Sequence, residues 1–399
     1  MKLRAFFFYI IFFVCVASLT SLGQNTDVDY TAIDKEALAI PTEKTKNTQD
    51  IANYILANFK TEDEKVRAIF IWTATNFEYD IDNMFAINFN EKQEDKIARV
   101  LKTRKGICEN YAAVFQDISK KCGLNAHIVV GYTRQNGFTS FIPHGWCAVK
   151  VAGKWQLVDP TWGSGYIDKN KFVSKISNEF FKANPTLLIK THMPFDPVWQ
   201  LLDHPVSFRQ FSDQDVVDKK DKTIFHYNDS IALFEHQTEV ERFETEISRI
   251  ENNGINNAVI YDRLSKIKSF VEVSRKNEVI NKQNEIVDIY NSAVTEFNEG
   301  TNDLNTFIEY RNKQFTPAKT DAQIRDMLQT AEQKMNRAEA TIKSIVGKYD
   351  KLDGMIATMD KSMKQANTIL NEQKDFLKKY LSKGKVERKF MFVKLTKGG

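Results

Sequence analysis

The sequence contains little cysteine, proline and glycine, and it carries little net charge. Four cysteines in 399 residues are too few for the dense disulfide framework of small secreted proteins. Eight prolines and 16 glycines exclude collagen-like and low-complexity chains. With 56 basic and 52 acidic residues, the net charge of +4 gives no overall nucleic-acid footprint. We therefore expect no nucleic-acid partner.

Motifs that hold metals or nucleotides are also missing from the sequence. There is no Cys/His spacing typical of zinc sites, no glycine-rich phosphate loop and no dinucleotide fingerprint. We expect neither a metal nor an organic cofactor. The composition, 42% hydrophobic and 12% aromatic, instead predicts at least one sizeable core and two or three domains in a chain of this length.

The N-terminal segment is typical of a secretory signal peptide. Two basic residues precede an apolar run over 5–17, and small residues stand at positions 21 and 23. The run is shorter than the roughly 20 apolar residues of a membrane-spanning helix. We expect cleavage after residue 23 and export to the periplasm, the cell envelope or the medium. An uncleaved membrane anchor is the alternative.

The rest of the chain changes character twice. All five tryptophans lie in a mixed region over 45–212, a charged segment follows, and helical periodicity dominates afterwards. The predicted organisation is a signal peptide (1–23), an N-terminal arm (24–44), a mixed domain (45–212), a linker (213–227), a long-helix bundle (228–383) and a basic tail (384–399).

The mixed region predicts helices first and an antiparallel sheet afterwards, which is an α+β arrangement. A capping box at Thr61 to Glu64 opens an amphipathic helix. A second helix begins near Cys108 and stops at Gly123. Short strands are expected over 126–132, 146–151 and 155–160.

The C-terminal part carries a regular apolar repeat. From Ile324 to Leu370 apolar residues alternate spacings of four and three, and the series continues to Tyr380. Such a repeat predicts coiled-coil-like helices, here an antiparallel all-α bundle. Turns are expected at Asn253–Gly254, 315–319 and Gly354.

Three residues of the mixed region stand where a nucleophilic enzyme would need them. Cys108 opens a helix, where free backbone N–H groups and the helix dipole favour the thiolate, which is the nucleophilic form. His144 precedes one expected strand, and Asp159 ends the next. This pattern predicts a triad of nucleophile, base and orienting carboxylate.

The hairpin between the last two strands tests that prediction. A two-residue turn at 152–153 places Trp146 opposite Asp159 and His144 opposite Thr161. His144 and Asp159 are then diagonal neighbours on one face, roughly 7–8 Å apart at their α-carbons. A three-residue turn would put them on opposite faces.

The cysteine count predicts at least one unpaired thiol, which we expect to be the reactive Cys108. Cleavage of the signal peptide removes Cys15 and leaves Cys108, Cys122 and Cys147, so at least one thiol stays unpaired. Cys122 continues the apolar stripe of its helix, and Cys147 faces away from His144. We expect both to be packed, inert thiols. A Cys122–Cys147 disulfide is the alternative.

Three motif-bearing segments contain or flank the candidate triad. In chain order they are VRAIFIWTATNFEYD, LKTRKGICENYAAVF and HGWCAVKVAGKWQLVDPTWGSG. Together they resemble the transglutaminase-like superfamily of papain-like cysteine enzymes. The later FFKANPTLLIKTHMPFDPVWQLLD resembles the branch related to kyphoscoliosis peptidase. The resemblance covers about 45–212 and implies a papain-like fold with Cys108 as nucleophile, His144 as base and Asp159 as orienter.

Other residues are weaker candidates. In similar family members a tryptophan helps the oxyanion site, for which Trp72 and Trp146 are the candidates. His192 is a candidate for lining the cleft. His127 begins an apolar strand and is expected to be a core residue.

The implied reaction is acyl transfer through a thioester formed from a peptide or glutamine carboxamide of a protein or peptide substrate. Water as acceptor gives a peptidase or deamidase, and a lysine amine gives a crosslinking enzyme. We expect hydrolysis. The alternative is a non-enzymatic binding or scaffold protein that uses an inactive transglutaminase-like domain and the helical bundle.

The bundle and the tail could involve further partners. We expect the helices to pack on themselves, with self-association or presentation to a partner as alternatives. The tail over 385–399 has five basic residues and one acidic residue. We expect it to be solvated, and weak contact with anionic membrane or envelope surfaces is the alternative.

Overall fold

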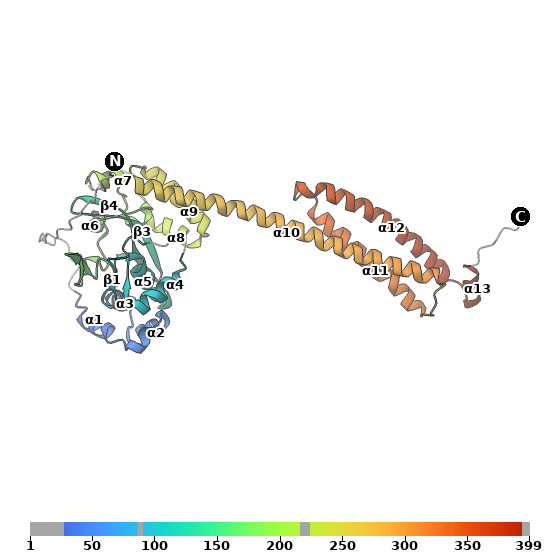
Figure 1. The fold of residues 1–399 in the computed structure, drawn as a ribbon, viewed down its shortest axis with the longest axis horizontal. Coiled ribbons are helices and arrows are strands. Elements are labelled where there is room, and N and C mark those ends of the chain that lie inside the picture. Colours follow the sequence, from blue (N-terminus) through green and yellow to red (C-terminus); the bar gives the residue numbers. More distant parts are fainter. Residues whose placement is uncertain (1–27, 87–90, 216–223, 393–399) are drawn as a thin grey trace, which may run out of the picture. The chain divides into compact units, whose positions relative to one another are not determined.

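The computed structural model describes residues 28–86, 91–215 and 224–392 and divides into two compact units, 1–271 and 272–399 (Figure 1). The predicted signal peptide lies outside the described residues, as does most of the predicted linker. Among the helices that the structure describes, none has both the length and the apolar character needed to cross a membrane.

A four-stranded antiparallel sheet organises unit 1. The strands lie in the order β5 (Lys154–Val158), β4 (Phe138–Val151), β3 (Ala126–Gln135) and β8 (His192–Pro194). The three predicted strands are present, and β3 and β4 extend further than the apolar runs indicate. The α+β fold class is confirmed.

The β4–β5 hairpin has the predicted two-residue turn. Ala152 and Gly153 both have positive φ, 47° and 79°, as a tight right-twisted hairpin requires. Val151 pairs with Lys154, and Cys147 pairs with Val158. This is the register that places His144 and Asp159 on one face, so the register prediction is confirmed.

Helices cover one face of this sheet. α5 (Cys108–Lys121) packs on β3 and β4, with α2 (Thr48–Asn58), α3 (Glu62–Asn76) and α4 (Gln93–Thr103) around it (Figure 1). Gly123, at a φ of 79°, follows the end of α5 as predicted.

The helix α3 differs from its prediction in one respect. The capping box between Thr61 and Glu64 is present. The helix is not amphipathic, however, because every residue from Val66 to Ala74 is buried. It lies between other helices, which cover it on all sides.

The segment 24–44 is more ordered than an unpatterned arm. Its described part contains α1 (Thr31–Leu38), and η1 (Thr42–Thr45) follows. α1 packs on α3, and Arg67 binds Asp34 through two hydrogen bonds of 2.7 Å. The N-terminal segment is therefore part of the core of unit 1.

The other face of the sheet is covered by elements that come later in the chain than β5. These are α6 (Pro185–Leu188), η3 (Pro197–Gln200), α7 (Phe208–Ser212), α8 (Tyr227–His236), α9 (Glu239–Asn253) and the first part of α10 (Ala258–Asn312). Apolar residues of α9 and α10, such as Ile250 and Ile260, share a buried cluster with Tyr132 and Met193. The two units therefore divide at 271/272, beyond the predicted linker, because the helices over 227–271 complete this core.

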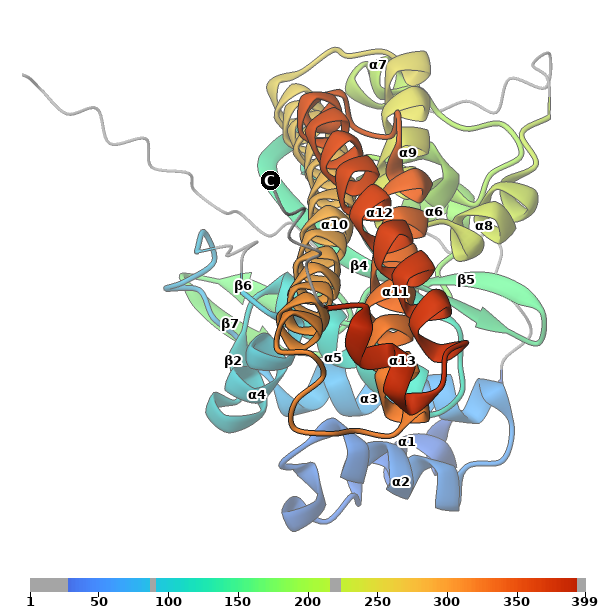
Figure 2. The same cartoon turned by 90° about the vertical axis from the view of Figure 1, so that its right-hand side faces the viewer.

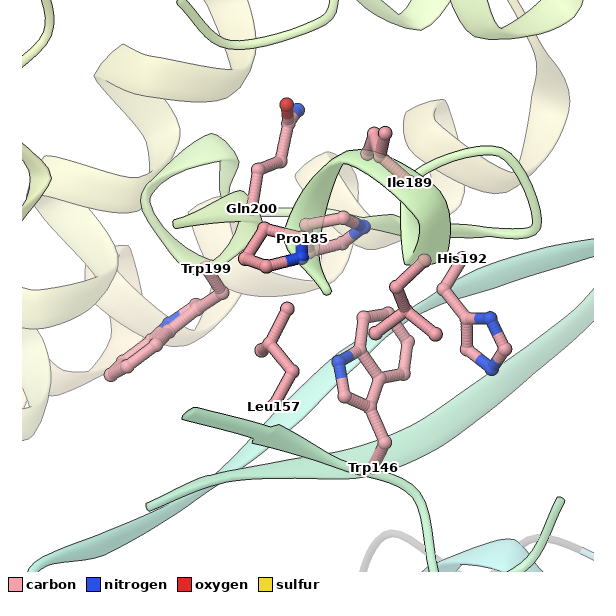
Figure 3. A pocket seen from close by; sticks show the side chains of 9 residues that line it. Trp146, Leu157, Pro185, Ile189, His192, Trp199 and Gln200 are labelled. Carbon is pink, nitrogen blue, oxygen red and sulfur yellow. The ribbon is translucent and has the colours of Figure 1, made fainter. Parts of the chain in front are cut away.

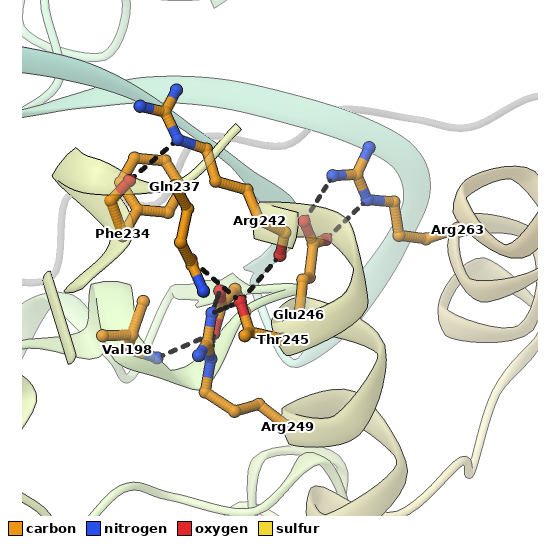
Figure 4. Close-up of polar contacts among 9 residues, drawn as sticks. Val198, Phe234, Gln237, Arg242, Thr245, Glu246, Arg249 and Arg263 are labelled. Carbon is orange, nitrogen blue, oxygen red and sulfur yellow. Dashed lines mark hydrogen bonds and ion pairs between the residues drawn. The ribbon is translucent and has the colours of Figure 1, made fainter. Parts of the chain in front are cut away.

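Two arginine–carboxylate pairs fix α9 in place (Figure 4). Arg249 binds Asp196 at 2.7 and 2.6 Å, and Asp196 also caps η3 by accepting from the N–H of Val198. Arg263 of α10 binds Glu246 of α9 at 2.8 and 2.9 Å. The segment that follows β8 is thus held by paired, hydrogen-bonded charges.

Short elements complete unit 1. β1 (Glu78–Tyr79) pairs in parallel with β2 (Lys105–Gly106), immediately before α5. β6 (Gly165–Asp168) and β7 (Lys171–Ser174) form a separate hairpin, and η2 (Asn178–Phe180) follows.

Unit 2 contains the rest of α10 with α11 (Asp321–Ile345), η4 (Asp350–Leu352), α12 (Asp353–Leu381) and α13 (Lys385–Phe390). α11 and α12 lie side by side (Figures 1 and 2) and share one apolar cluster with α10. The predicted repeat supplies this cluster: every repeat position of α11 from Ile324 to Ile345 is buried.

Two details of unit 2 differ from expectation. Gly354 lies inside α12, and the turn falls earlier, at Gly347, which has a φ of 70°. The described part of the tail is not fully solvated: Arg388 binds Asp321 at 2.6 and 2.8 Å, and Phe392 packs against the apolar cluster.

We predict that Gly131→Ala destabilises unit 1. Gly131 pairs with Pro194, and a β-carbon there would lie 2.1 Å from the carbonyl oxygen of Met193. Thermal unfolding should show a loss of about 1–3 kcal/mol, the usual cost of overpacking. Gly145→Ala is the control, because its β-carbon would meet nothing closer than 4.0 Å. Equal stability of the two variants would contradict the close approach of β8 to β3.

Candidate active site

The centre of the candidate site is a buried carboxylate. Asp159 follows β5 directly and is 0% exposed. Its Oδ1 accepts from the backbone N–H groups of Thr161 at 2.8 Å and Trp162 at 3.1 Å. A buried charge is tolerated only where it is paired and hydrogen-bonded, so the Asp-Pro-Thr-Trp turn fixes one carboxylate oxygen.

The second oxygen of Asp159 faces two imidazoles. His144 of β4 approaches Oδ2 through Nε2 at 2.7 Å. His192, the first residue of β8, approaches the same oxygen through Nε2 at 3.1 Å, and its Nδ1 lies 2.8 Å from Oγ1 of Thr191. His192 is 1% exposed, so it is buried, and it lines the small cavity described below.

Cys108 is also a neighbour of His144. Its thiol is within hydrogen-bonding reach of the imidazole. Since Nε2 of His144 is bonded to Asp159, Nδ1 is the nitrogen that faces the sulfur. The structure therefore brings together Cys108, His144 and Asp159, in the order that a triad requires.

The start of α5 provides a site for negative charge. Cys108 is the first residue of the helix, and the N–H of Ile107 donates to Oδ1 of Asn110 at 2.9 Å, which fixes the entry of the chain. Backbone N–H groups in a first helical turn have no acceptor within the helix, and the helix dipole is positive there. The N–H of Cys108 is thus placed to stabilise a thiolate or an oxyanion next to it.

His144 and Asp159 each stabilise the charged form of the other. Burial alone would lower the pKa of His144, but the charge and hydrogen bond of Asp159, with help from Cys108, raise it to about 10. Burial alone would raise the pKa of Asp159, but the charge and hydrogen bond of His144 and the hydrogen bond of His192 hold it below its ordinary value. At neutral pH the pair is an imidazolium bonded to a carboxylate.

His192 differs from His144 in its charge. Burial lowers its pKa, and this outweighs the attraction of Asp159. A neutral His192 donates from Nε2 to the carboxylate and accepts from Thr191 at Nδ1.

His144, Asp159 and His192 also form a group that could hold a metal ion, since their ligand atoms lie within 4.8 Å of one another. The two contacts at 2.7 and 3.1 Å are hydrogen-bond lengths to a single oxygen. A zinc ion, with bonds of about 2.0–2.2 Å, would have to displace both ring protons inside a buried cluster. The arrangement fits a proton network better than a metal centre.

Two tryptophans, Trp146 and Trp162, contact the imidazoles of the site, and Trp72 does not in the described contacts. Trp146 stacks on His144 with ring centroids 5.9 Å apart. Trp162 lies 5.9 Å from His144 and 4.5 Å from His192. Trp72 instead packs edge-on against Phe77, so of the two tryptophan candidates Trp146 is the one in contact with the imidazole.

Tyr79 is a neighbour of Cys108 that the sequence analysis did not single out. Burial, together with the nearby charge of Cys108, raises the pKa of its hydroxyl. It pairs with Gly106, two residues before Cys108, through the short β1–β2 bridge. A two-residue strand leaves no periodic signal, so only the three-dimensional contact reveals it.

The remaining cysteines are separate from the site. Cys108, Cys122 and Cys147 are all free. Cys147 donates to the carbonyl oxygen of Ala112 at 3.5 Å, and Cys122 donates to that of Ala52 at 3.8 Å. Burial raises the pKa of Cys122 to about 11 and also raises that of Cys147, so both are packed, protonated thiols.

A small cavity lies behind the site (Figure 3). It has room of about 10 Å³, and Trp146, His192 and Gln200 are among the residues that line it. Nε1 of Trp146 is buried and has no hydrogen-bond partner in the described part of the chain. This volume holds about one water molecule, so the cavity is too small for a peptide.

Residues 49–160, which include all three members of this arrangement, match the sequence profile of the Transglutaminase-like superfamily. The chain contains a transglutaminase-like domain. The resemblance noted in the sequence is thereby confirmed.

Two curated relatives and one solved structure illustrate the similarity. The chain is 36% identical over 170 residues to the kyphoscoliosis peptidase of Homo sapiens, a match that covers 41% of this chain and 25% of that protein. It is 24% identical over 204 residues to hillarin of Drosophila melanogaster, covering 46% of this chain and 24% of that protein. The chain thus spans about a quarter of the length of these relatives. A solved TGase structure is 22% identical at a TM-score of 0.24, covering 40% of this chain and 39% of that one.

We predict that His144 stays protonated through neutral pH and releases its proton near pH 10, whereas His192 is neutral at pH 7. Because the folded-state pKa of His144 is raised, the stabilisation from its ion pair is present at low and neutral pH and is lost as the pH rises through about 10. Ring nitrogen chemical shifts in an NMR titration measure both residues.

Asp159→Asn removes the negative charge that raises the pKa of His144, while the burial that lowers this pKa remains. In this variant the pKa of His144 should therefore be at or below its ordinary value of 6.5. His192 in the wild-type protein serves as the internal control. A wild-type His144 that loses its proton below pH 7 would contradict the ion pair.

Proposed function

We propose that this chain is an exported cysteine enzyme that transfers acyl groups through a thioester on Cys108. The observation that carries the proposal is the continuous line from the Cys108 thiol through His144 to the buried carboxylate of Asp159. The transglutaminase-like profile over residues 49–160 supports a cysteine-based reaction.

The first half-reaction follows from this arrangement. The Cys108 thiolate attacks the carbonyl carbon of a peptide or a glutamine carboxamide, forming a C–S bond and an oxyanion that the first N–H groups of α5 can stabilise. The imidazolium of His144 gives its proton to the leaving amine or ammonia as the C–N bond breaks. Asp159 keeps the ring oriented and stabilises its charged form.

The second half-reaction regenerates the thiolate. A nucleophile loses a proton to the now neutral His144 and attacks the thioester, and the sulfur leaves as thiolate beside the restored imidazolium. With water the product is an acid, and with a lysine amine it is a crosslink. We propose hydrolysis, as in a peptidase or deamidase, because the relative with 36% identity is named a peptidase and water needs no binding site of its own.

A second function is favoured by the closure of the site. Cys108 is 7% exposed and His144 is 8% exposed, while a substrate carbonyl must touch the sulfur. A protein that stays in this closed form would be a binding or scaffold protein built from an inactive transglutaminase-like domain and the helical bundle. The intact Cys–His–Asp arrangement favours the enzyme.

Export and the role of unit 2 are also part of the proposal. The basic start and apolar run over 1–17 support export to the periplasm, the envelope or the medium. The single apolar cluster of α10, α11 and α12 supports self-packing of the helices. Arg388 and Phe392 contact the bundle and are not available to another surface. We therefore propose that any contact of the tail with an anionic surface is made by its lysines.

We predict that a thiol-reactive acyl probe labels Cys108 of the folded protein, and that His144→Ala lowers the labelling rate by about 10²–10⁴-fold, because no base or ion-pair partner remains. Peptide mass spectrometry locates the label. Cys122→Ala is the control and should label normally, since Cys122 lies away from His144 in the helical core. A correctly folded protein that takes no label at Cys108 would support the scaffold function.

The acceptor is identified by incubating the wild-type protein and Cys108→Ala with a mixture of peptides, with and without an added primary amine. Cleaved bonds or deamidated glutamines that depend on Cys108 support hydrolysis. Amine adducts in place of these products would replace hydrolysis by crosslinking.

A further inference from the structure

We propose that His192 is a positioning residue that holds the Asp159 carboxylate in the orientation needed by His144. This inference rests on the proposed function, because it assigns to a second buried histidine a part in the same reaction. His192 does not touch Cys108 in any described contact, so it acts through Asp159.

Four donors surround the carboxylate of Asp159. Backbone N–H groups of Thr161 and Trp162 hold Oδ1, and both imidazoles approach Oδ2. A carboxylate fixed by backbone donors on one oxygen alone can still turn about its terminal bond. His192 is the second donor to Oδ2, so this oxygen is held by both imidazoles and not by His144 alone.

His192 is itself rigidly held. It pairs with Thr133 on β3, and its Nδ1 lies 2.8 Å from Oγ1 of Thr191. The ring lies against Trp162 at 4.5 Å and Trp146 at 5.3 Å. A donor that is fixed in this way can fix the group it binds.

The segment that follows β8 is also held in place. Two residues after this strand, Asp196 is bound by Arg249 of α9. The close approach of β8 to Gly131 leaves no space for a side chain between them. The elements after the profile-matched residues 49–160 therefore contribute to the site through His192.

The test uses two variants of nearly equal polarity. In His192→Gln the amide nitrogen can occupy the place of Nε2 and still donate to Asp159. In His192→Asn the amide nitrogen falls near the place of Nδ1 and cannot reach Asp159. The readout is the rate at which iodoacetamide alkylates Cys108 between pH 5 and 10, with the site of alkylation identified by peptide mass spectrometry.

In the wild-type protein, Cys108 should be alkylated readily, because the thiolate is the reactive form and the neighbouring His144 and the start of α5 favour it. At about pH 6.5, Cys108 of His192→Asn should react about tenfold more slowly than Cys108 of the wild-type protein. His192→Gln should stay within about twofold of the wild-type rate, since the charge-assisted hydrogen bond is retained.

His127→Asn is the matched control. His127 lies in the same sheet, packs against Trp155 and Trp199, and touches no member of the triad in the described contacts. It should leave the alkylation profile unchanged. Thermal unfolding of all three variants identifies any effect of stability alone.

The outcomes separate the inference from the proposed function. A His192→Asn profile equal to that of the wild type, or equal losses in the Gln and Asn variants, would overturn the positioning role and leave the proposed function intact. If His192→Asn does not fold, a profile of His192→Gln shifted like that of an ordinary thiol overturns the role, and a retained profile supports it. A wild-type protein whose Cys108 reacts as an ordinary thiol would overturn both.

Discussion

The buried charge of Asp159 is the constraint on which the rest of the site depends. A carboxylate with no solvent exposure is unfavourable unless donors surround it, and here two backbone N–H groups and two imidazoles do so. Its charge raises the pKa of His144, and the charged ring in turn faces the thiol at the start of α5. Cys108, His144 and Asp159 therefore form one electrostatic unit.

Different parts of unit 1 position the residues around Asp159. The β4–β5 hairpin fixes His144 relative to Asp159, because its two-residue turn leaves one register. The helix α5 begins at Cys108, so the sulfur lies at the positive end of the helix dipole. β8 brings His192 from beyond the hairpin, and α9 holds the segment after β8 through Arg249.

Local rules predicted much of this arrangement. The turn at Ala152 and Gly153, the capping box at Thr61 and the apolar repeat after Ile324 each depend on residues close in sequence, and each is present. What could not be predicted depends on distant contacts. His192 bonds to Asp159 across 33 residues, and no spacing rule connects them. The packing of α9 and α10 in unit 1 likewise results from burial against β3 and β8, and the repeat alone does not indicate where one unit ends.

The most direct test of this account is a crystal structure of the protein reacted with a peptide aldehyde. We expect a covalent bond between Sγ of Cys108 and the aldehyde carbon, with the new oxygen near the N–H of Cys108. His144 should remain bonded to Asp159 through Nε2, and its Nδ1 should face the adduct. An intact aldehyde, or an adduct on Cys122 or Cys147 beside an unmodified Cys108, would contradict the account.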